Sequence, residues 1–429
     1  MSANSPKWVP PMARPVALHS LGWMLAANLV GVWLALALLW PAAGDALAPL
    51  TYGRWVPLHL DWQLYGWCAL PLVGVLLGWF FDSQHPGAGR QARLALGAWS
   101  AALVLGGIGW LGGTTSGRLF LDWHGWTRPL LPAAMLVMWA LLAVHLWGRW
   151  RRLPVAGRVG RAIVLAVLVA VPAVLYWSAG REVHPAVNPD SGGATGAALL
   201  GSTLGIVTIY LVLPAMLGLK RGDAAAGARE GRPRRMRAGG ATLAFGVLGA
   251  SWLVFAAIAR GDASHHAPSQ IAALALLLMW IPLLPAHWAG YVWPVETRPW
   301  RRAATVWWAL LVASGWLTFL PGHSEALKFT HGLVAHAHLA MAGFVTSVNG
   351  MLVITLTGRA GPCGVFWLWQ GGCAVTVAAM LALGGLEAGA VAELFRSEPW
   401  TQGLLELRLA GGAAMTVASL KWLAGFARA

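Results

Sequence analysis

The sequence predicts an all-α membrane protein of about twelve transmembrane helices, forming one polytopic domain over residues 1–429. Hydrophobic residues make up 58% of the chain and charged residues only 10%, which is typical of a membrane-embedded bundle. Apolar stretches repeatedly reach 18 or more residues, enough for a helix to cross the hydrocarbon core. The longest non-apolar stretch, 220–238, is rich in Arg and Gly and is expected to form a basic cytoplasmic loop, so no second domain is predicted.

Windows of about 20 apolar residues place the individual helices. They cover 17–41, 58–81, 92–112, 128–147, 159–180, 195–219, 239–260, 269–290, 302–321, 330–357, 363–387 and 400–427. The first window is long enough to remain in the membrane as a helix, so we expect no cleaved signal peptide. The even number of windows puts both termini on one side of the membrane.

The net charge of +15 could suggest a nucleic-acid partner, but its distribution indicates topology instead. With the N-terminus inside, the inner segments hold 22 of the 30 Lys and Arg residues and the outer loops hold seven. This asymmetry is the positive-inside bias. We therefore expect cytoplasmic termini, a multi-pass location in a bacterial inner membrane, contact with membrane lipid and no nucleic-acid partner.

The three cysteines exclude several kinds of site. Cys68, Cys363 and Cys373 all fall at or within apolar windows, and no CxxC or CxxCH motif is present. A disulfide framework, a cysteine zinc site and a covalently attached heme c are therefore unsupported. Any heme c that takes part would belong to a partner.

Several histidines are expected at one depth, near the outer face. His59 falls in the first turn of the second window, and both His336 and His338 fall near the start of the tenth. Both windows run from outside to inside. His265 and His266 lie in the outer loop after the seventh window.

The pair His336 and His338 has the most informative spacing. Residues two apart on a helix point ~200° apart, so these two side chains face opposite sides and serve different metal ions. A lone intramembrane histidine is more often a packing residue, as we expect for His19, His145 and His287. Two at this spacing, level with a third on another helix, instead favour heme b, whose iron takes axial imidazoles in a slot between helices.

Three segments resemble the heme-copper oxidase superfamily, within it the catalytic subunit of cbb-type cytochrome c oxidases and the large subunit of nitric oxide reductases. They are YGRWVPLHLDWQLYGW from Tyr52, GTTSGRLFLDW from Gly113 and SGWLTFLPGHSEALKFTHGLVAHAHLAMAGFVTSVNGML from Ser314. The family's twelve helices match the predicted number, so the resemblance implies a heme-copper-oxidase-like bundle.

The resemblance also implies roles for individual residues. His59 and His338 would be the axial ligands of a low-spin heme b, and His336 the proximal ligand of a second, high-spin heme. Arg54 would pair with a propionate, although an interfacial anchor explains it equally well. The family usually works with a periplasmic cytochrome c-type subunit or other redox subunits.

The sequence departs from the family where the second metal should bind. The sixth window has no histidine, and Ser202 stands where a copper ligand is expected. His265 and His266 form a pair beyond the end of the seventh window, and they remain candidates for residual copper. The expected tyrosine is absent, with Ile206 four residues after Ser202, and windows six to eight contain no Asp or Glu for a non-heme iron site.

Three functions follow. The leading hypothesis is a heme b redox subunit of a respiratory complex that transfers electrons without an intact binuclear centre. The first alternative is an active terminal oxidase or nitric oxide reductase with an atypical metal site that includes His265, His266 and His184. The second is a heme-binding sensor or assembly factor.

Overall fold

The chain is an all-α, multi-pass membrane protein. The computed structural model describes residues 10–82, 85–222, 235–389 and 398–428, and within these ranges it has helices, loops and two isolated β-bridges but no strand. Eleven helical stretches in the described ranges are long and apolar enough to cross a membrane. The predicted basic loop over 220–238 lies largely outside the described residues.

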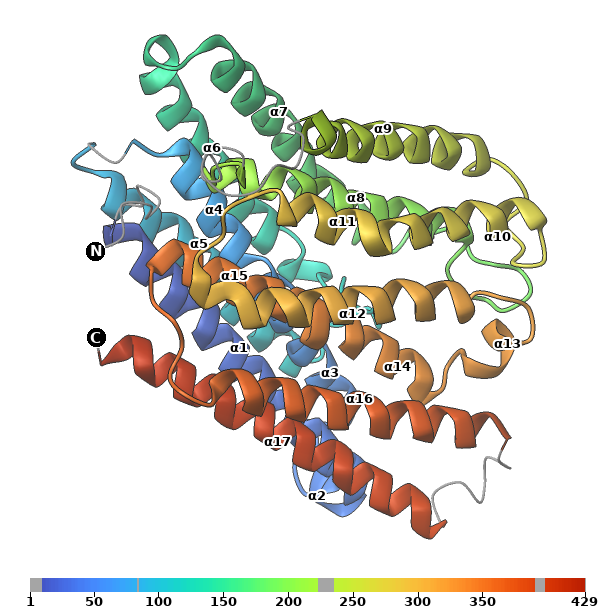
Figure 1. The fold of residues 1–429 in the computed structure, drawn as a ribbon. Helices are drawn as coiled ribbons and strands as arrows, with labels where there is room; N and C mark the ends of the chain where they lie inside the picture. The colour runs from blue at the N-terminus through green and yellow to red at the C-terminus, as the bar shows by residue number, and fades with distance from the viewer. Residues whose placement is uncertain (1–9, 83–84, 223–234, 390–397, 429) are drawn as a thin grey trace. The chain divides into compact units, whose positions relative to one another are not determined.

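The helices follow one another along the chain in two groups (Figure 1). The first group is α1 (Pro10–Leu39), α2 (Pro41–Asp45), α3 (Tyr52–Asp61), η1 (Trp62–Cys68), α4 (Leu70–Phe80), α5 (Ala88–Leu111), η2 (Gly125–Thr127), α6 (Leu130–Arg149), η3 (Trp150–Arg152) and α7 (Val155–Ser178). The second group is α8 (Gly196–Met216), α9 (Arg235–Ile258), α10 (Pro268–Ala275), η5 (Leu276–Met279), α11 (Trp280–Ala289), η6 (Val295–Thr297), α12 (Arg298–Leu317), α13 (His323–Leu327), α14 (His331–His338), η7 (Leu339–Val345), α15 (Thr346–Thr357), α16 (Val365–Gly389) and α17 (Pro399–Ala427).

Each predicted window overlaps a long helical stretch. Eleven of these are candidate membrane spans, and the remaining one is α12, a helix of 20 residues that overlaps the predicted window 302–321 and ends at Leu317. Arg298, Arg301 and Arg302 lie in the first turns of α12. These charges make α12 less apolar than the eleven candidate spans.

The chain divides into two compact units. Unit 1 comprises Met1–His184, Asn349–Val375 and Leu405–Ala429, and unit 2 comprises Pro185–Val348 and Thr376–Leu404. In unit 1, α1 packs along α3, η1, α4 and α5. The start of α1 and the end of α17 meet at one end of this unit, where Arg14 donates to the carbonyl of Ala427 at 3.2 Å (Figure 1).

Close approach between helices in unit 1 depends on glycine. A Cβ added at Gly66 would lie 2.6 Å from Cβ of Trp23, and one added at Gly74 would lie 2.6 Å from a methyl group of Val16. Both distances are shorter than van der Waals contact, so a larger residue at either position would push α1 away. Small residues at helix contacts are a general means of packing helices closely in membranes.

In unit 2, α8 packs against α9, α10 and α11, and α12 packs along η7. Buried indole and imidazole groups join these helices through backbone carbonyls. Trp288 donates to the carbonyl of Tyr210 at 2.9 Å, and Trp308 donates to that of Trp280 at 2.7 Å. His287, expected to be a packing residue, donates to the carbonyl of Leu211 at 2.9 Å. Part of the large tryptophan content therefore packs between helices.

Within the described ranges, two helices contain π-helical turns. η1 interrupts the helix of α3 and α4, and η7 interrupts that of α14 and α15. A π-turn displaces backbone carbonyls from their usual partners, and in a membrane these must find others. In η1, the carbonyl of Tyr65 accepts from the indole of Trp99 at 2.8 Å, and that of Trp67 accepts from the amide of Asn349 at 2.8 Å.

Candidate functional site

His59 lies on α3 in unit 1 and is held by α1. Its Nδ1 lies 2.8 Å from the carbonyl oxygen of Ala27. A carbonyl can only accept, so Nδ1 carries the proton and the lone pair is on Nε2. The ring rests on Gly31, where an added Cβ would lie 2.6 Å from Cε1 of the imidazole. A backbone acceptor thus sets the tautomer, and the glycine makes room for the ring.

His336 lies on α14 in unit 2 and is oriented by α12. Its Nδ1 lies 3.1 Å from Oγ of Ser314, and that hydroxyl donates its own proton to the carbonyl of Leu311 at 3.2 Å. Ser314 therefore accepts from Nδ1, and the lone pair of His336 is again on Nε2. Gly315 lies beside the ring, where an added Cβ would be 3.3 Å from Cε1.

His338 is held within its own helix. Its Nδ1 donates to the carbonyl of Val334, one turn earlier, at 2.9 Å. The imidazole of His336 contacts α12, whereas the Nδ1 of His338 bonds to α14 itself. All three histidines, including His59, thus share one state, with the proton on Nδ1 and the lone pair on Nε2. A hydrogen bond that fixes the ring and its tautomer is a regular feature of metal-binding histidines.

The π-turns follow directly after these histidines in sequence. η7 begins at Leu339, the residue after His338, and η1 begins at Trp62, three residues after His59. π-helices are rare, and single π-turns within α-helices are frequent at functional sites. Both π-turns, η1 and η7, therefore lie next to a predicted iron ligand in the sequence.

His331 has a structural role. Its backbone N–H and its Nδ1 bond to Oε2 of Glu387 on α16, at 2.7 and 3.0 Å. A carboxylate at a helix N-terminus is favourable because the helix dipole is positive there. Close by, an added Cβ at Gly384 would lie 2.2 Å from the backbone nitrogen of Gly332. α16 therefore locks the start of the helix that carries His336 and His338.

Arg54 caps a neighbouring helix. Its guanidinium donates to the carbonyl of Leu111, the last residue of α5, at 2.9 Å, and lies beside Gly113. A cation is favourable at a helix C-terminus. This contact accounts for Arg54 within unit 1, and pairing with a propionate remains a prediction.

Ser202 does not occupy a ligand position. Its side chain is exposed, and its hydroxyl donates to the carbonyl of Leu199 on its own helix at 3.1 Å. The resemblance to the heme-copper oxidase superfamily puts Ser202 where a copper ligand is expected. On α8 it lies instead on the exposed face.

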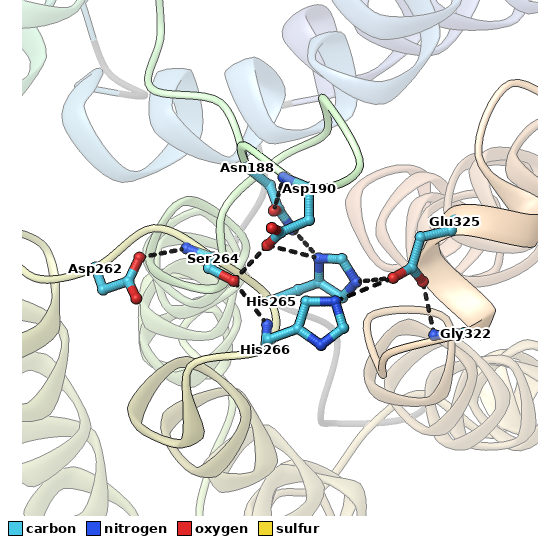
Figure 2. A network of polar contacts seen from close by, with 8 residues as sticks. All are labelled: Asn188, Asp190, Asp262, Ser264, His265, His266, Gly322 and Glu325. Carbon is cyan, nitrogen blue, oxygen red and sulfur yellow. Dashed lines mark hydrogen bonds and ion pairs between the residues drawn. The ribbon is translucent and has the colours of Figure 1, made fainter.

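The histidine pair belongs to a cluster of loop residues in unit 2, shown in Figure 2. His265 is completely buried and bonds through Nδ1 to the amide of Asn188 at 2.8 Å and through Nε2 to Oε1 of Glu325 at 2.7 Å. Nε2 of His266 lies 3.2 Å from the same carboxylate oxygen. Asp190 completes the cluster, with Oδ2 3.5 Å from Nδ1 of His265.

Electrostatics favour the charged form of Glu325. Its own backbone N–H is the largest cause that lowers the pKa of this carboxyl, to about 2, and His265 and the N–H of Gly322 also donate to it. The carboxylate is therefore ionised at physiological pH and accepts from Nε2 of His265.

Sequence reasoning identified the histidines and missed their acidic partners. Asp190 lies in the loop before α8, and no local spacing in the sequence links it to His265. Glu325 and Glu387 carried no signal either, because each meets its histidine only through the fold. His184, suggested as a third member of a metal site, belongs to unit 1, and the candidate metal group in the described residues is instead Asp190, His265 and His266.

Comparisons with known proteins add no assignment. A scan against models of known protein families finds no match, and no curated protein matches the chain.

Proposed function

We propose that this chain is a membrane-embedded heme b redox subunit of a respiratory complex in a bacterial inner membrane. The observation that carries the proposal is the shared state of three imidazoles. His59, His336 and His338 each have Nδ1 engaged by a hydrogen bond and the lone pair on Nε2. An axial imidazole binds iron in this tautomer, so the donors fit heme b.

Each residue has a role in the proposal. His59 and His338 would hold a low-spin heme, a pairing that rests on the sequence resemblance. His336 would hold a second heme. When bound, heme iron takes up and releases one electron at a time. The partner would be a periplasmic cytochrome c-type or other redox subunit, because the three histidines are predicted near the outer face.

The protein's own contribution is to hold the rings. The carbonyl of Ala27 and the hydroxyl of Ser314 set the two tautomers, and Gly31 and Gly315 leave room for the imidazoles. Prearranged ligands lower the cost of ordering the site when heme binds. The proposal is an electron-transfer role and not dioxygen or nitric oxide reduction, because α8 contains no His, Asp or Glu to hold a second metal and Ser202 lies on its exposed face.

The test uses the full-length chain purified from membranes, with heme quantified and the optical and electron paramagnetic resonance spectra recorded. We expect His59→Ala to abolish the low-spin spectrum, and His336→Ala to leave it largely intact while removing a high-spin signal. The matched control is His19→Ala, because His19 bonds to the hydroxyl of Ser100 at 2.7 Å and is assigned no ligand role.

Two results would overturn the proposal or part of it. A purified chain without heme rejects the function. Loss of the low-spin signal in His336→Ala, with retention in His59→Ala, shows that the two imidazole roles are reversed.

A further inference from the structure

The cluster around His265 brings three loop segments of unit 2 together at one point. Asp190 lies in the loop before α8, His265 and His266 lie between α9 and α10, and Glu325 lies on α13 (Figure 2). One ligand atom from each of Asp190, His265 and His266 lies within 4.8 Å of the other two. Two imidazoles and a carboxylate are a donor set that Zn²⁺ accepts, often with a fourth position left to water.

Hydrogen bonds fix the orientation of the Asn188 amide and, through it, the tautomer of His265. Oδ1 of Asn188 accepts from the backbone N–H of Asp190 at 3.1 Å, so its NH₂ group is the one that faces Nδ1 of His265 at 2.8 Å. Nδ1 is therefore an acceptor, and the ring proton is on Nε2, where it is donated to Glu325 at 2.7 Å.

This tautomer places two electron-pair donors face to face. Nδ1 of His265 and Oδ2 of Asp190 are 3.5 Å apart, and neither has a proton to offer the other. Ser264 donates to the same oxygen of Asp190, so that hydroxyl belongs to the loop and holds the carboxylate in place. A cation that displaced the Asn188 amide from Nδ1 would accept one electron pair from His265 and one from Asp190, in place of an approach between two acceptors.

The distances match a metal site that has still to contract slightly. Ligands of tetrahedral Zn²⁺ at ~2.0–2.1 Å from the ion lie ~3.3–3.4 Å from one another. Oδ2 of Asp190 and Nδ1 of His265 are 3.5 Å apart, close to this separation. The ligand atoms of Asp190, His265 and His266 all lie within 4.8 Å of one another. Asp190 and His266 are exposed loop residues, whose side chains can close the remainder by rotation.

Glu325 has the role that an outer-shell carboxylate has in zinc proteins. It accepts from Nε2 of His265 and contacts Nε2 of His266 at 3.2 Å. Metal-binding histidines commonly donate their other ring N–H to a carboxylate, which fixes the ring and raises its basicity. Binding would also link loops far apart in sequence, so the ion would stabilise the folded form of unit 2.

We propose that Asp190, His265 and His266 bind one divalent metal ion of the zinc class, with Glu325 orienting both imidazoles. The site is separate from the proposed heme ligands and does not depend on them. It also differs from the copper site suggested by the family resemblance, because it has a carboxylate ligand from a loop and no residue from α8.

The experiment measures Zn²⁺ binding to the full-length chain in detergent micelles, produced with an affinity tag that contains no histidine. After chelator treatment and dialysis, calorimetry gives the affinity and elemental analysis gives the zinc content per chain. We expect wild type to bind one Zn²⁺ per chain. In Asp190→Asn and His266→Ala, the affinity for Zn²⁺ should be at least ~100-fold lower than in wild type. Glu325→Gln should weaken binding about 10–100-fold, as outer-shell changes do.

The matched control is His323→Ala. His323 is an exposed histidine two residues before Glu325, so it reports zinc captured by surface imidazoles in the same region. Its affinity should equal that of wild type. The proposal is overturned if wild type binds no Zn²⁺ at micromolar concentration, which leaves only a hydrogen-bonded loop contact. It is overturned equally if Asp190→Asn and His266→Ala bind as tightly as wild type.

Discussion

The contact between α16 and the start of α14 predicts a large effect from one methyl group. In Gly384→Ala, the new Cβ would lie 2.2 Å from the nitrogen of Gly332 and 2.5 Å from its Cα, whereas ordinary contact begins at 3.4 Å. Both opposing atoms are backbone, so no side chain can rotate away. α14 must move by about 1 Å relative to α16, and overpacking of this kind costs about 1–3 kcal/mol.

The adjacent glycine provides the control. An added Cβ at Gly385 meets nothing within 4 Å, so Gly385→Ala should be neutral or stabilise the helix by about 0.5–1 kcal/mol. Thermal unfolding of the full-length chain in micelles, followed by tryptophan fluorescence, measures both variants. Gly384→Ala should also disturb the heme spectrum, because α14 carries His336 and His338. If Gly384→Ala unfolds at or above the temperature of Gly385→Ala, the predicted clash with the backbone of Gly332 is refuted.

Two further predictions test other parts of the chain. Gly31→Ala should displace the ring of His59 and reduce heme content, whereas Gly22→Ala, where an added Cβ meets nothing within 4 Å, should retain it; equal heme content in the two purified variants would contradict this. Nζ of Lys328 is buried without a hydrogen-bond partner, and burial lowers the pKa of this ammonium, so Lys328→Met should raise the free energy of unfolding at pH 7 by about 1 kcal/mol. The Lys328 amine binds its proton more tightly in the unfolded chain than in the folded chain, so the free energy of unfolding of wild type should rise as the pH approaches 10.5. That of Lys328→Met should not show this rise. If wild type and Lys328→Met change equally in melting temperature between pH 7 and pH 10, the burial of a charged Lys328 is refuted.

The helices could be read from the sequence because apolar length is a local property. A run such as 159–180 must form a helix in a membrane, since every backbone group needs an internal partner there. The structure has α7 (Val155–Ser178) at that place. The π-turns could not be read in this way. η1 is stabilised by donors from Trp99 and Asn349, which are distant in sequence, and no local pattern indicates their approach.

The candidate site also has features that local sequence predicts and features that depend on contacts between distant segments. The spacing of His336 and His338 is local, so helix geometry alone predicts that the two rings point in opposite directions. The state of the His336 ring could not be predicted in this way, because Ser314 reaches His336 from another helix. The loop cluster is a further case, since His265 was visible as half of a pair but its partners Asp190 and Glu325 come from separate segments.

By itself, the sequence determined that this chain is an all-α, multi-pass membrane protein and which histidines are candidates to bind metal. Both properties depend on the hydrophobicity and spacing of neighbouring residues. Only the tertiary structure decided which nitrogen of His59, His336 and His265 carries the proton and which carboxylates stand beside the histidine pair. These depend on hydrogen bonds between segments 22 to 77 residues apart, such as Ser314 with His336 and Asn188 with His265, which form only when the helices pack.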